Sequence, residues 1–414
     1  MDGGALMLVE SLARKTLGVK DHRVVKVAQE EGGLVVRLDR RKGRHLPCSI
    51  CGVRAKVRDR LPERIWRHVP LWGIAVTLIY RPYRVLCPRC GTRVEKIPWA
   101  DGKSPLSGGL VYVLAVWARL LPWDVVGSLF GVAWGTVASA VKGAVRYGLE
   151  HRDTLGVLHI GIDEISRRKG QVYMTVVYDL DRKRLLWCGD GRGEDTLRRF
   201  FNGWGREATG RIEGICCDMW APYIKVVRER CPDALIVFDK FHLVRHLIEA
   251  VDKVRKLEAW ALKSAEPELL KGTKYLWLKN PWNLTPRQKQ RLGFLEKLNL
   301  KVHRAYLLKE LFRQLWTYKR MGWAALFLKK WFWWATHSRL KPMRDFAWML
   351  RRHQDGILAY FKLRIDNGAV EAMNNNAKQV SHRAHGFRTP ATFATNLYHC
   401  LGKLPLPIPV HKFM

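Results

Sequence analysis

The order of strand-like and helix-like segments after residue 155 limits the possible folds more than any other feature of this sequence. Three β-type runs come first, VLHIGIDEI, QVYMTVVYDL and RLLWCG, and only the short turns SRRKG and DRK separate them. A helical segment at about 194–206 follows, and two further strands, in RIEGICCDMW and DALIVFDKFH, then alternate with helices. A meander followed by such alternation predicts an α/β fold with mixed strand pairing.

Acidic residues stand at unusual places in these strands. Asp163 and Glu164 interrupt the first strand, and Asp218 and Asp239 end the two later ones. Side chains alternate along a strand, so Asp163 faces one side of the sheet and Glu164 the other. Two neighbouring carboxylates repel each other, and a divalent cation relieves that repulsion. Because Mg²⁺ prefers carboxylate oxygens, the sequence predicts a magnesium site involving Asp163 and Asp218.

The order of elements is that expected of an RNase H-like fold, and a later helix offers a third acid. The segment LRIDNGAVEAMNNNAKQVSHRAHGFRT predicts a helix that begins near Asn367. Its polar stripe consists of Glu371, Asn374, Asn375 and Lys378. Its apolar, core-facing stripe consists of Val370, Met373, Ala377 and Val380. The amide-rich polar stripe suits phosphate and sugar contacts, and an ordinary exposed helix face is the alternative.

Four cysteines occur as two C-x-x-C pairs, each followed by glycine. Cys48 and Cys51 form the first pair and Cys87 and Cys90 the second. Four thiolates can close a tetrahedral zinc site, although the 35 residues between the pairs exceed the usual spacing. The intervening sequence reads as a β-hairpin that turns near Gly73, and a hairpin can bring distant ends together. We therefore expect structural Zn²⁺ rather than two unrelated thiol pairs.

The apolar segment 107–148 predicts three helices at about 107–120, 123–130 and 134–147. A short helix, a glycine-containing turn and a longer helix are typical of a helix-turn-helix unit, and a small helical bundle is the alternative. In such a unit the second helix enters the major groove of DNA. Its candidate DNA-binding residues here are Trp134, Thr136, Ser139 and Lys142.

Basic residues strongly outnumber acidic ones. The 73 Lys and Arg against 37 Asp and Glu give a formal charge of +36, so the expected partner is a polyanion, most simply nucleic acid. An anionic membrane surface is the alternative, but the most apolar stretch, 106–145, contains Arg119 and Asp124 and predicts no spanning helix. The sequence shows no signal peptide, so we expect a reducing location inside the cell, in the cytoplasm.

A helical, basic region rich in tryptophan follows the last strand. Residues 241–360 hold 25 Lys and Arg against 9 Asp and Glu, an excess of 16. The run KKWFWWATHSRLK interleaves aromatic and basic side chains, which suits DNA backbones and unstacked bases. Tryptophan is more often a core residue, so we expect at least half of the tryptophans here to be buried.

Several motifs together resemble the transposases of ISL3-family bacterial insertion sequences. They are GIDEISRRKGQVYMTVVYDLDRKRLLW, CDMWAPYIKVV, FDKFHLVRHL, LKNPWNLTPRQKQRL and NGAVEAMNNNAKQVSHRAHGF, together with the two cysteine pairs and the LFGVAWGTV helix-turn-helix. The likeness covers nearly the whole chain, with the motifs in the family's order. Two positions depart from the family pattern, Gly135 in the recognition helix and Ala377 in the late helix.

The resemblance implies a DDE transposase with an RNase H-like core and an all-helical insertion. The catalytic triad would be Asp163, Asp218 and Glu371, which would bind two Mg²⁺ or Mn²⁺ ions for phosphoryl transfer, with Asp163 bridging both ions. The D-x-x-H element would be Asp239 with His242, and Glu164 would be structural, pairing with Arg167 or Arg168. Near the triad the resemblance also places Asn374, Asn375 and Lys378.

Five segments are expected from these observations. They are 1–100 with a zinc-binding module of four cysteines at about 45–95, a helix-turn-helix domain at 101–152, a first part of the catalytic core at 153–248, a basic helical insertion at 249–355, and a second part of the core at 356–414 that carries the Glu-bearing helix and the C-terminal tail.

The expected partners are the terminal inverted repeats and target DNA, both double-stranded, and a second copy of the chain in a homodimer or larger homo-oligomer. Two other functions stay open at this point. A domesticated, zinc-dependent DNA-binding protein would explain the charge and the cysteines but leave the acids to chance. A structure-specific nuclease would share the metal site without strand transfer.

Overall fold

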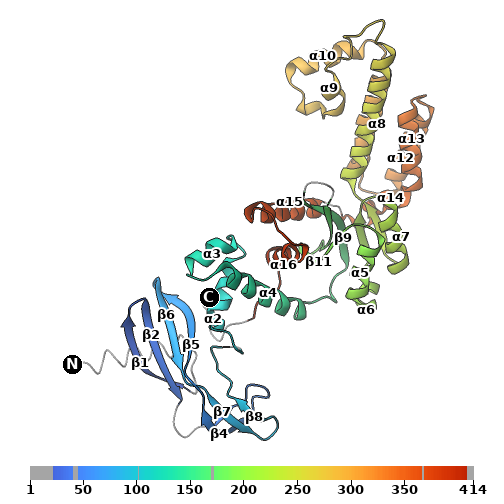
Figure 1. Ribbon diagram of the computed structural model, residues 1–414. Helices are drawn as coiled ribbons and strands as arrows, with labels where there is room; N and C mark the ends of the chain where they lie inside the picture. Colours follow the sequence, from blue (N-terminus) through green and yellow to red (C-terminus); the bar gives the residue numbers. More distant parts are fainter. Residues whose placement is uncertain (1–21, 41–44, 101, 169–171, 366–367, 408–414) are drawn as a thin grey trace. The chain divides into compact units, whose positions relative to one another are not determined.

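The computed structural model describes residues 22–40, 45–100, 102–168, 172–365 and 368–407 (Figure 1). The chain divides into two compact units. The first contains residues up to Arg152, a short stretch at His382–His385 and the chain from Ala391 on, and the second contains Asp153–Ser381 and Gly386–Pro390. Each unit has its own hydrophobic core, and they are described separately.

The first unit begins with a four-stranded sheet of order β1–β2–β6–β5. Its strands are β1 (His22–Glu30), β2 (Gly33–Arg40), β6 (Ile74–Tyr80) and β5 (Arg64–Leu71). Strands β5 and β6 form the hairpin predicted from the sequence, with Leu71 opposite Ile74. Trp72 and Gly73 make the two-residue turn at φ of 51° and 81°, a left-handed conformation that favours glycine. The predicted turn near Gly73 is confirmed.

A second small sheet, of order β3–β4–β7–β8, carries the cysteine pairs. Its strands are β3 (Leu46–Pro47), β4 (Arg54–Arg60), β7 (Tyr83–Cys87) and β8 (Gly91–Val94). Antiparallel pairing of β4 with β7 brings the two C-x-x-C turns to the same end of this sheet. Its core is small and is formed by Leu46, Cys48, Ala55, Val85 and Cys87.

Three helices complete this part of the chain, as the sequence predicts. They are α2 (Gly108–Trp117), α3 (Trp123–Leu129) and α4 (Trp134–Glu150). The Ser107 side chain caps α2 by accepting from Leu110 N–H. Gly131, at φ 60°, lies in the turn between α3 and α4, and these two helices meet at 112°. That angle lies in the range of helix-turn-helix units.

The last helix, α16 (Pro390–Leu401), differs from the expected arrangement. From Ala391 on it belongs to the first unit, whereas the sequence analysis grouped it with the Glu-bearing helix in 356–414. The buried His399 ring lies 2.7 Å from the Ala115 carbonyl oxygen, and Arg119 donates to the Leu404 carbonyl. Contacts between positions more than 280 residues apart leave no local sequence signal, which explains the difference.

The second unit is built on a five-stranded mixed sheet of order β11–β10–β9–β12–β13. The strands are β9 (His159–Arg168), β10 (Val172–Asp179), β11 (Arg184–Asp190), β12 (Gly214–Cys217) and β13 (Leu235–Phe238). The first three are antiparallel, and β12 and β13 run parallel to β9. The predicted meander and alternation are confirmed, so the fold is mixed α/β.

Helices cover both faces of this sheet. One face packs against α5 (Glu194–Trp204) and α7 (Ala221–Arg230), with a short α6 (Arg206–Gly210) between them. The other face meets α15 (Gly368–Arg383), where Asn374 contacts Asp163 and Tyr178. The apolar residues predicted for this helix, Val370, Met373, Ala377 and Val380, are all buried.

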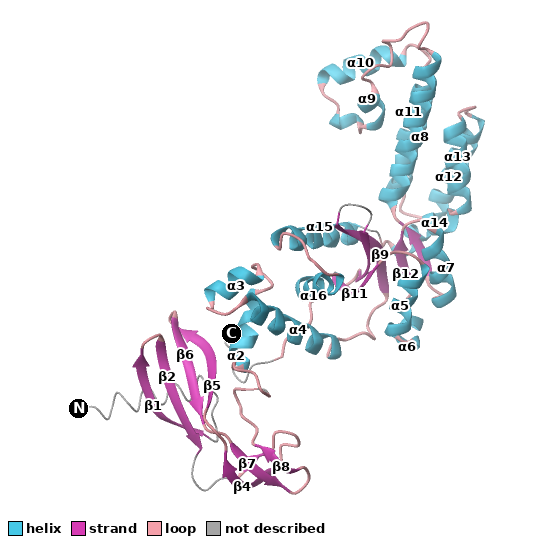
Figure 2. Cartoon of the chain, viewed as in Figure 1, coloured by secondary structure: helices cyan, strands magenta, loops and turns pink. Residues whose placement is uncertain are grey.

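An all-helical segment lies between β13 and α15 (Figure 2). It consists of α8 (Lys240–Ala261), α9 (Lys274–Leu278), α10 (Pro286–Glu296), α11 (Lys301–Arg313), α12 (Met321–His337), α13 (Lys341–Arg352) and α14 (Gln354–Leu363), with 3₁₀ turns η1 (Pro281–Asn283) and η2 (Gln314–Thr317). The expectation that half of its tryptophans are buried is wrong. Of nine, only Trp277 and Trp331 are core. The helices bury narrow stripes, so a tryptophan beside the stripe is exposed.

No single helix in the described part of the chain is long and apolar enough to span a membrane, although α3 and α4 pass a test of length and composition as a bent pair.

Candidate active site

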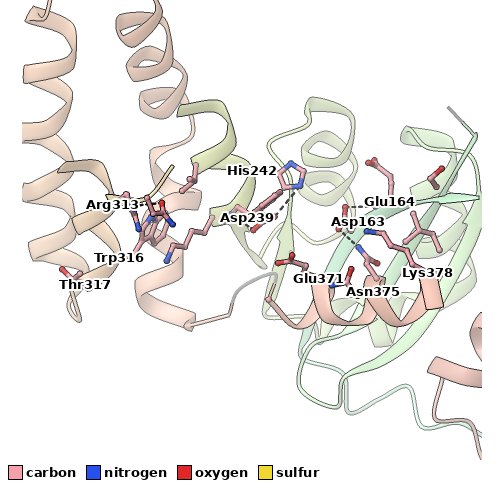
Figure 3. Close-up of a pocket in the computed structure, with 18 of the residues that line it drawn as sticks. Asp163, Glu164, Asp239, His242, Arg313, Trp316, Thr317, Glu371, Asn375 and Lys378 are labelled. Carbon is pink, nitrogen blue, oxygen red and sulfur yellow. Dashed lines mark hydrogen bonds and ion pairs between the residues drawn. The ribbon is translucent and has the colours of Figure 1, made fainter. Parts of the chain in front are cut away.

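A cavity of about 940 Å³ lies in the second unit (Figure 3). Strand β9, the start of α8 and helix α15 form one side, and the end of α11 with both 3₁₀ turns forms the other. It is called the acidic cavity below, because Asp163, Glu164, Asp239 and Glu371 line it.

Asp163 is held by donors on two sides. The Glu164 backbone N–H donates to its Oδ1 at 2.8 Å, and the Asn374 side chain donates to its Oδ2 at 2.7 Å. Burial raises the pKa of Asp163 to about 6, the neighbouring acids Glu164 and Asp239 add to that, and the Glu164 N–H and His242 oppose it. Because ionisation of this carboxylate costs free energy, a cation in the cavity would stabilise its charged form.

A buried relay fixes the orientation of Asn374. The Tyr178 hydroxyl donates to Asn374 Oδ1 at 2.8 Å, so the Asn374 amide nitrogen faces Asp163. Tyr178 is fully buried on β10 beside β9, and Asn374 is 8% exposed. The sequence analysis placed Asn374 near the acids, but the hydroxyl behind it was not anticipated.

Asp218 follows β12 and contacts the cavity through His242. His242 Nδ1 lies 3.0 Å from Asp218 Oδ2, and its Nε2 lies 3.6 Å from Asp239 Oδ2. The Asp218 carboxylate raises the pKa of His242 against the effect of burial. Burial raises the pKa of Asp218, but His242 and the Met219 N–H lower it further, below its usual value. The imidazole therefore lies between two carboxylates, which favour its protonated form.

Helix α15 brings the predicted polar stripe to the cavity. Glu371, Asn374, Asn375 and Lys378 all line it. Glu371, Asn375 and Lys378 are exposed to it, whereas Asn374 is buried beneath them. One carboxylate, two amides and one ammonium thus face the same space (Figure 3).

Glu164 behaves differently from its neighbour Asp163. It also lines the cavity, but its interaction is with the Tyr223 hydroxyl on the opposite face of the sheet. Burial raises the pKa of Tyr223, and the Glu164 carboxylate adds to the effect. Among the described residues no ion pair joins Glu164 to Arg167 or Arg168, so the expected pairing is not observed.

The far wall of the cavity comes from the helical segment and was not predicted as part of the site. It includes Asn280, Trp282, Arg313 and Trp316. The sequence signal was too diffuse to find it, because many tryptophans and basic residues occur between 241 and 360.

In the first unit, the sulfur atoms of Cys48, Cys51, Cys87 and Cys90 all lie within 4.8 Å of one another. These four residues are called the cysteine cluster. In the described ranges, no other group of three or more histidine, cysteine or acidic side chains has its ligand atoms this close together. The acids of the cavity are therefore more widely spaced than the four cysteines. Gly52 and Gly91 follow the two pairs at φ of 70° and 71°, which gives both turns the same knuckle shape. The arrangement fits a tetrahedral zinc site.

The predicted recognition helix exposes most of its candidate residues. Trp134 is 63% exposed, Ser139 and Lys142 are exposed, and Thr136 is half-buried. Their burial pattern follows from Val137 and Val141, which face the core of the three-helix unit.

Comparisons with known proteins show which family the chain resembles. Residues 160–397 match the family model DDE_Tnp_ISL3, described as a transposase. The chain is 31% identical over 413 residues to the transposase for insertion sequence element IS1557 of Mycobacterium tuberculosis, covering 92% of each protein. It is 29% identical over 350 residues to the transposase for insertion sequence element IS1001 of Bordetella parapertussis, covering 84% of this chain and 86% of the relative.

Proposed function

The chain belongs to the ISL3 family of transposases, and from this premise we propose that it is a DDE transposase whose metal-binding acids are Asp163, Asp218 and Glu371. Its function is DNA transposition. The proposal concerns the residues and the chemistry, namely metal-dependent cleavage of DNA strands at the element's ends and their transfer to target DNA.

One observation carries this proposal. Asp163 on β9 and Glu371 on α15 line one cavity, and Asp218, after β12, lies 3.0 Å from His242, which lines the same cavity. The strand order β11–β10–β9–β12–β13 supports an RNase H-like core, with the acids on its first and fourth strands in chain order.

The donor set suits divalent cations. Carboxylate oxygens are preferred by Mg²⁺ and Mn²⁺, and ligands shared between two ions need not gather as tightly as four thiolates around one. When bound, the two ions supply activation of the attacking oxygen and stabilisation of the leaving oxygen.

The chain's own residues prepare this site. Asn374, held by Tyr178, keeps one oxygen of Asp163 hydrogen-bonded and leaves the carboxylate in a fixed orientation. His242 lies 3.0 Å from Asp218 Oδ2 and can orient this carboxylate, which in turn raises the pKa of the imidazole. Lys378 and Asn375 lie on the same face of α15 as Glu371, where they can contact a DNA phosphate.

DNA recognition falls to the first unit in this proposal. The cysteine cluster would hold structural Zn²⁺, and the helix from Trp134 would enter the major groove of a terminal inverted repeat. Segments 1–100 and 101–152 then form the end-binding part, 153–248 and helix α15 hold the catalytic residues, and 249–355 is the insertion. A homodimer would allow both ends of an element to be held together.

The test is strand cleavage with Mg²⁺ on DNA that carries the element's ends, measured beside binding to the same DNA. Asp163→Asn and Glu371→Gln should each abolish cleavage and spare binding, because a two-metal site has no spare ligand. Glu164→Gln is the matched control, one residue away on the other face of the strand. Wild-type cleavage by Asp163→Asn, or a selective loss with Glu164→Gln, would show that the triad is assigned wrongly.

A further inference from the structure

The wall of the acidic cavity opposite the acids holds a tryptophan backed by an arginine. The Arg313 guanidinium carbon lies 4.2 Å from the centre of the Trp282 ring. Arg313 Nη1 also donates to Asn280 Oδ1 at 2.7 Å and to Glu310 Oε2 at 3.4 Å. The guanidinium is thus fixed by two acceptors while it lies against the ring, and the ring in turn is held in place by a cation–π contact.

Trp282 is nevertheless open to the cavity. It is 66% exposed although it stands in a short 3₁₀ turn that lines a concave site. The neighbouring Trp316 shows the contrast. It is half-buried and stacks on Phe361 at 6.1 Å, with Lys240 Nζ 5.2 Å from its ring centre. Trp316 is therefore part of the packed wall, whereas Trp282 presents an aromatic surface that the protein itself does not cover.

The chemistry of this wall selects a ligand. An aromatic face with a fixed cation behind it stacks nucleobases without regard to their sequence, and the positive charge favours the attached phosphates. A volume of about 940 Å³ is in the range of pockets for small ligands, so it is large enough for an unpaired nucleotide. A base can reach this surface only if it leaves the helical stack, at some cost in free energy.

We propose that Trp282, backed by Arg313, stacks an unpaired nucleobase of the strand that enters the acidic cavity. The enzyme thereby binds DNA that is locally opened next to the scissile phosphate. This inference rests on the proposed function, since it takes DNA to be the ligand of the cavity. It adds a binding site on the helical insertion, and this site recognises the local structure of DNA instead of its sequence.

The experiment compares two probes with the full-length protein. One is a forked duplex with 2-aminopurine in its unpaired arm, and the other is a fully paired duplex of the same sequence. Ca²⁺ replaces Mg²⁺ so that binding is measured without cleavage, by anisotropy for affinity and by 2-aminopurine fluorescence for stacking.

Wild type should prefer the fork, and Trp282→Ala should reduce that preference by about tenfold or more, as expected for loss of a base–aromatic stack. Trp282→Phe should retain most of it and most of the fluorescence change. Trp260→Ala is the matched control, because Trp260 is 78% exposed but lies eighteen residues along α8 from His242, about 27 Å at the rise of an α-helix.

Two results would overturn the inference. One is an unchanged fork preference and fluorescence signal in Trp282→Ala. The other is an equal loss of affinity for both probes, which indicates a structural role for the ring. Because no arm depends on cleavage, a protein that prefers the fork through Trp282 but fails to cleave with Mg²⁺ would contradict the proposed triad and leave the stacking site intact.

Discussion

The cysteine cluster and the acidic cavity both gather ligands from distant parts of the chain, but they are constructed in opposite ways. The cysteines lie in a small sheet whose core contains only three buried apolar residues besides two of the cysteines themselves. The acids lie on or beside a five-stranded sheet that packs against α5, α6 and α7 through a much larger core. A metal ion is expected to stabilise the fold at the first site and to perform chemistry at the second.

The two sites also differ in whether the surrounding protein compensates the charge of their ligands. In the acidic cavity the protein already compensates its carboxylates, with His242 between Asp218 and Asp239 and with Asn374 on Asp163. In the cysteine cluster the thiols face mainly one another, and Cys51 Sγ lies 3.4 Å from Cys87 Sγ. We therefore expect the acidic site to keep its geometry without metal ions and the cysteine site to depend on one.

The largest expected effect tests this difference directly. Cys87→Ser should lower the zinc content from about one per chain to almost none and unfold the small sheet, because structural zinc supplies folding free energy. Metal analysis and circular dichroism measure both. Asp163→Asn should retain its zinc, and so should Cys231→Ser, which changes a buried cysteine outside the cluster. An unchanged zinc content in Cys87→Ser would refute the zinc assignment.

The sequence located both sites for physical reasons that are local. Paired C-x-x-C-G turns indicate a zinc knuckle. An acid inside an apolar strand or on an amide-rich helix face indicates a functional residue, because its charge is costly to bury. The strand alternation predicted that Asp163 and Glu164 face opposite sides, and their contacts with Asn374 and Tyr223 agree with it. Such features depend on neighbours a few residues away.

What the sequence could not predict depends on contacts between distant segments. Nothing in the run around Trp282 indicates that Arg313, thirty-one positions later, fixes it against the cavity wall. Periodicity alone does not distinguish a tryptophan on the buried stripe of a helix from one beside it, so the prediction that at least half of the insertion tryptophans are buried was wrong. The assignment of α16 to the first unit also depends on contacts between distant segments, so the sequence did not predict it.

A pH titration should distinguish the two sites next. Burial raises the pKa of Asp163 to about 6, so protons compete with metal there. Mn²⁺ affinity, followed by calorimetry, should rise as the pH passes upward through about 6 and then level off. Asp163→Asn should lose this rise. A flat profile in wild type between about pH 5 and 7 would contradict the role of Asp163 as a ligand.

The raised pKa of Asp163 also predicts how the stability of the protein without metal at the acidic cavity changes with pH. Since the pKa of Asp163 is raised in the folded protein above its ordinary 3.8, folding favours the protonated form. Its stabilising contribution is complete below the unfolded pKa and is lost as the pH rises through about 6. Asp163→Asn should therefore have a higher Tm than wild type at neutral pH in zinc-loaded protein without added Mg²⁺ or Mn²⁺, and no advantage near pH 4.

A smaller effect concerns the relay behind Asp163. Tyr178→Phe leaves Asn374 Oδ1 without its donor and should cost about 1–3 kcal/mol of stability. It should also weaken Mn²⁺ binding and slow cleavage, since the Asn374 amide is free to turn away from Asp163. Tyr223→Phe is the matched control, another buried tyrosine, whose hydroxyl contacts Thr175 and Glu164 and not Asn374. Equal effects of both variants on Mn²⁺ affinity would show that Tyr178 has only a structural role.

The smallest expected effect lies on the predicted recognition helix and probes the first unit without disturbing its cysteine cluster. Lys142 is exposed on α4, and no contact in the described part of the chain requires it for folding. If it contacts a phosphate, Lys142→Ala should weaken binding to cognate and scrambled DNA alike and reduce the slope of log affinity against log salt by about 1. Ser139→Ala, one turn earlier on the same helix, removes no charge and should leave the salt slope unchanged. Binding isotherms at several salt concentrations give both slopes. An unaltered slope for Lys142→Ala would mean that this face of α4 lies away from the DNA backbone, and the electrostatic contribution would then have to come from other basic residues of the first unit.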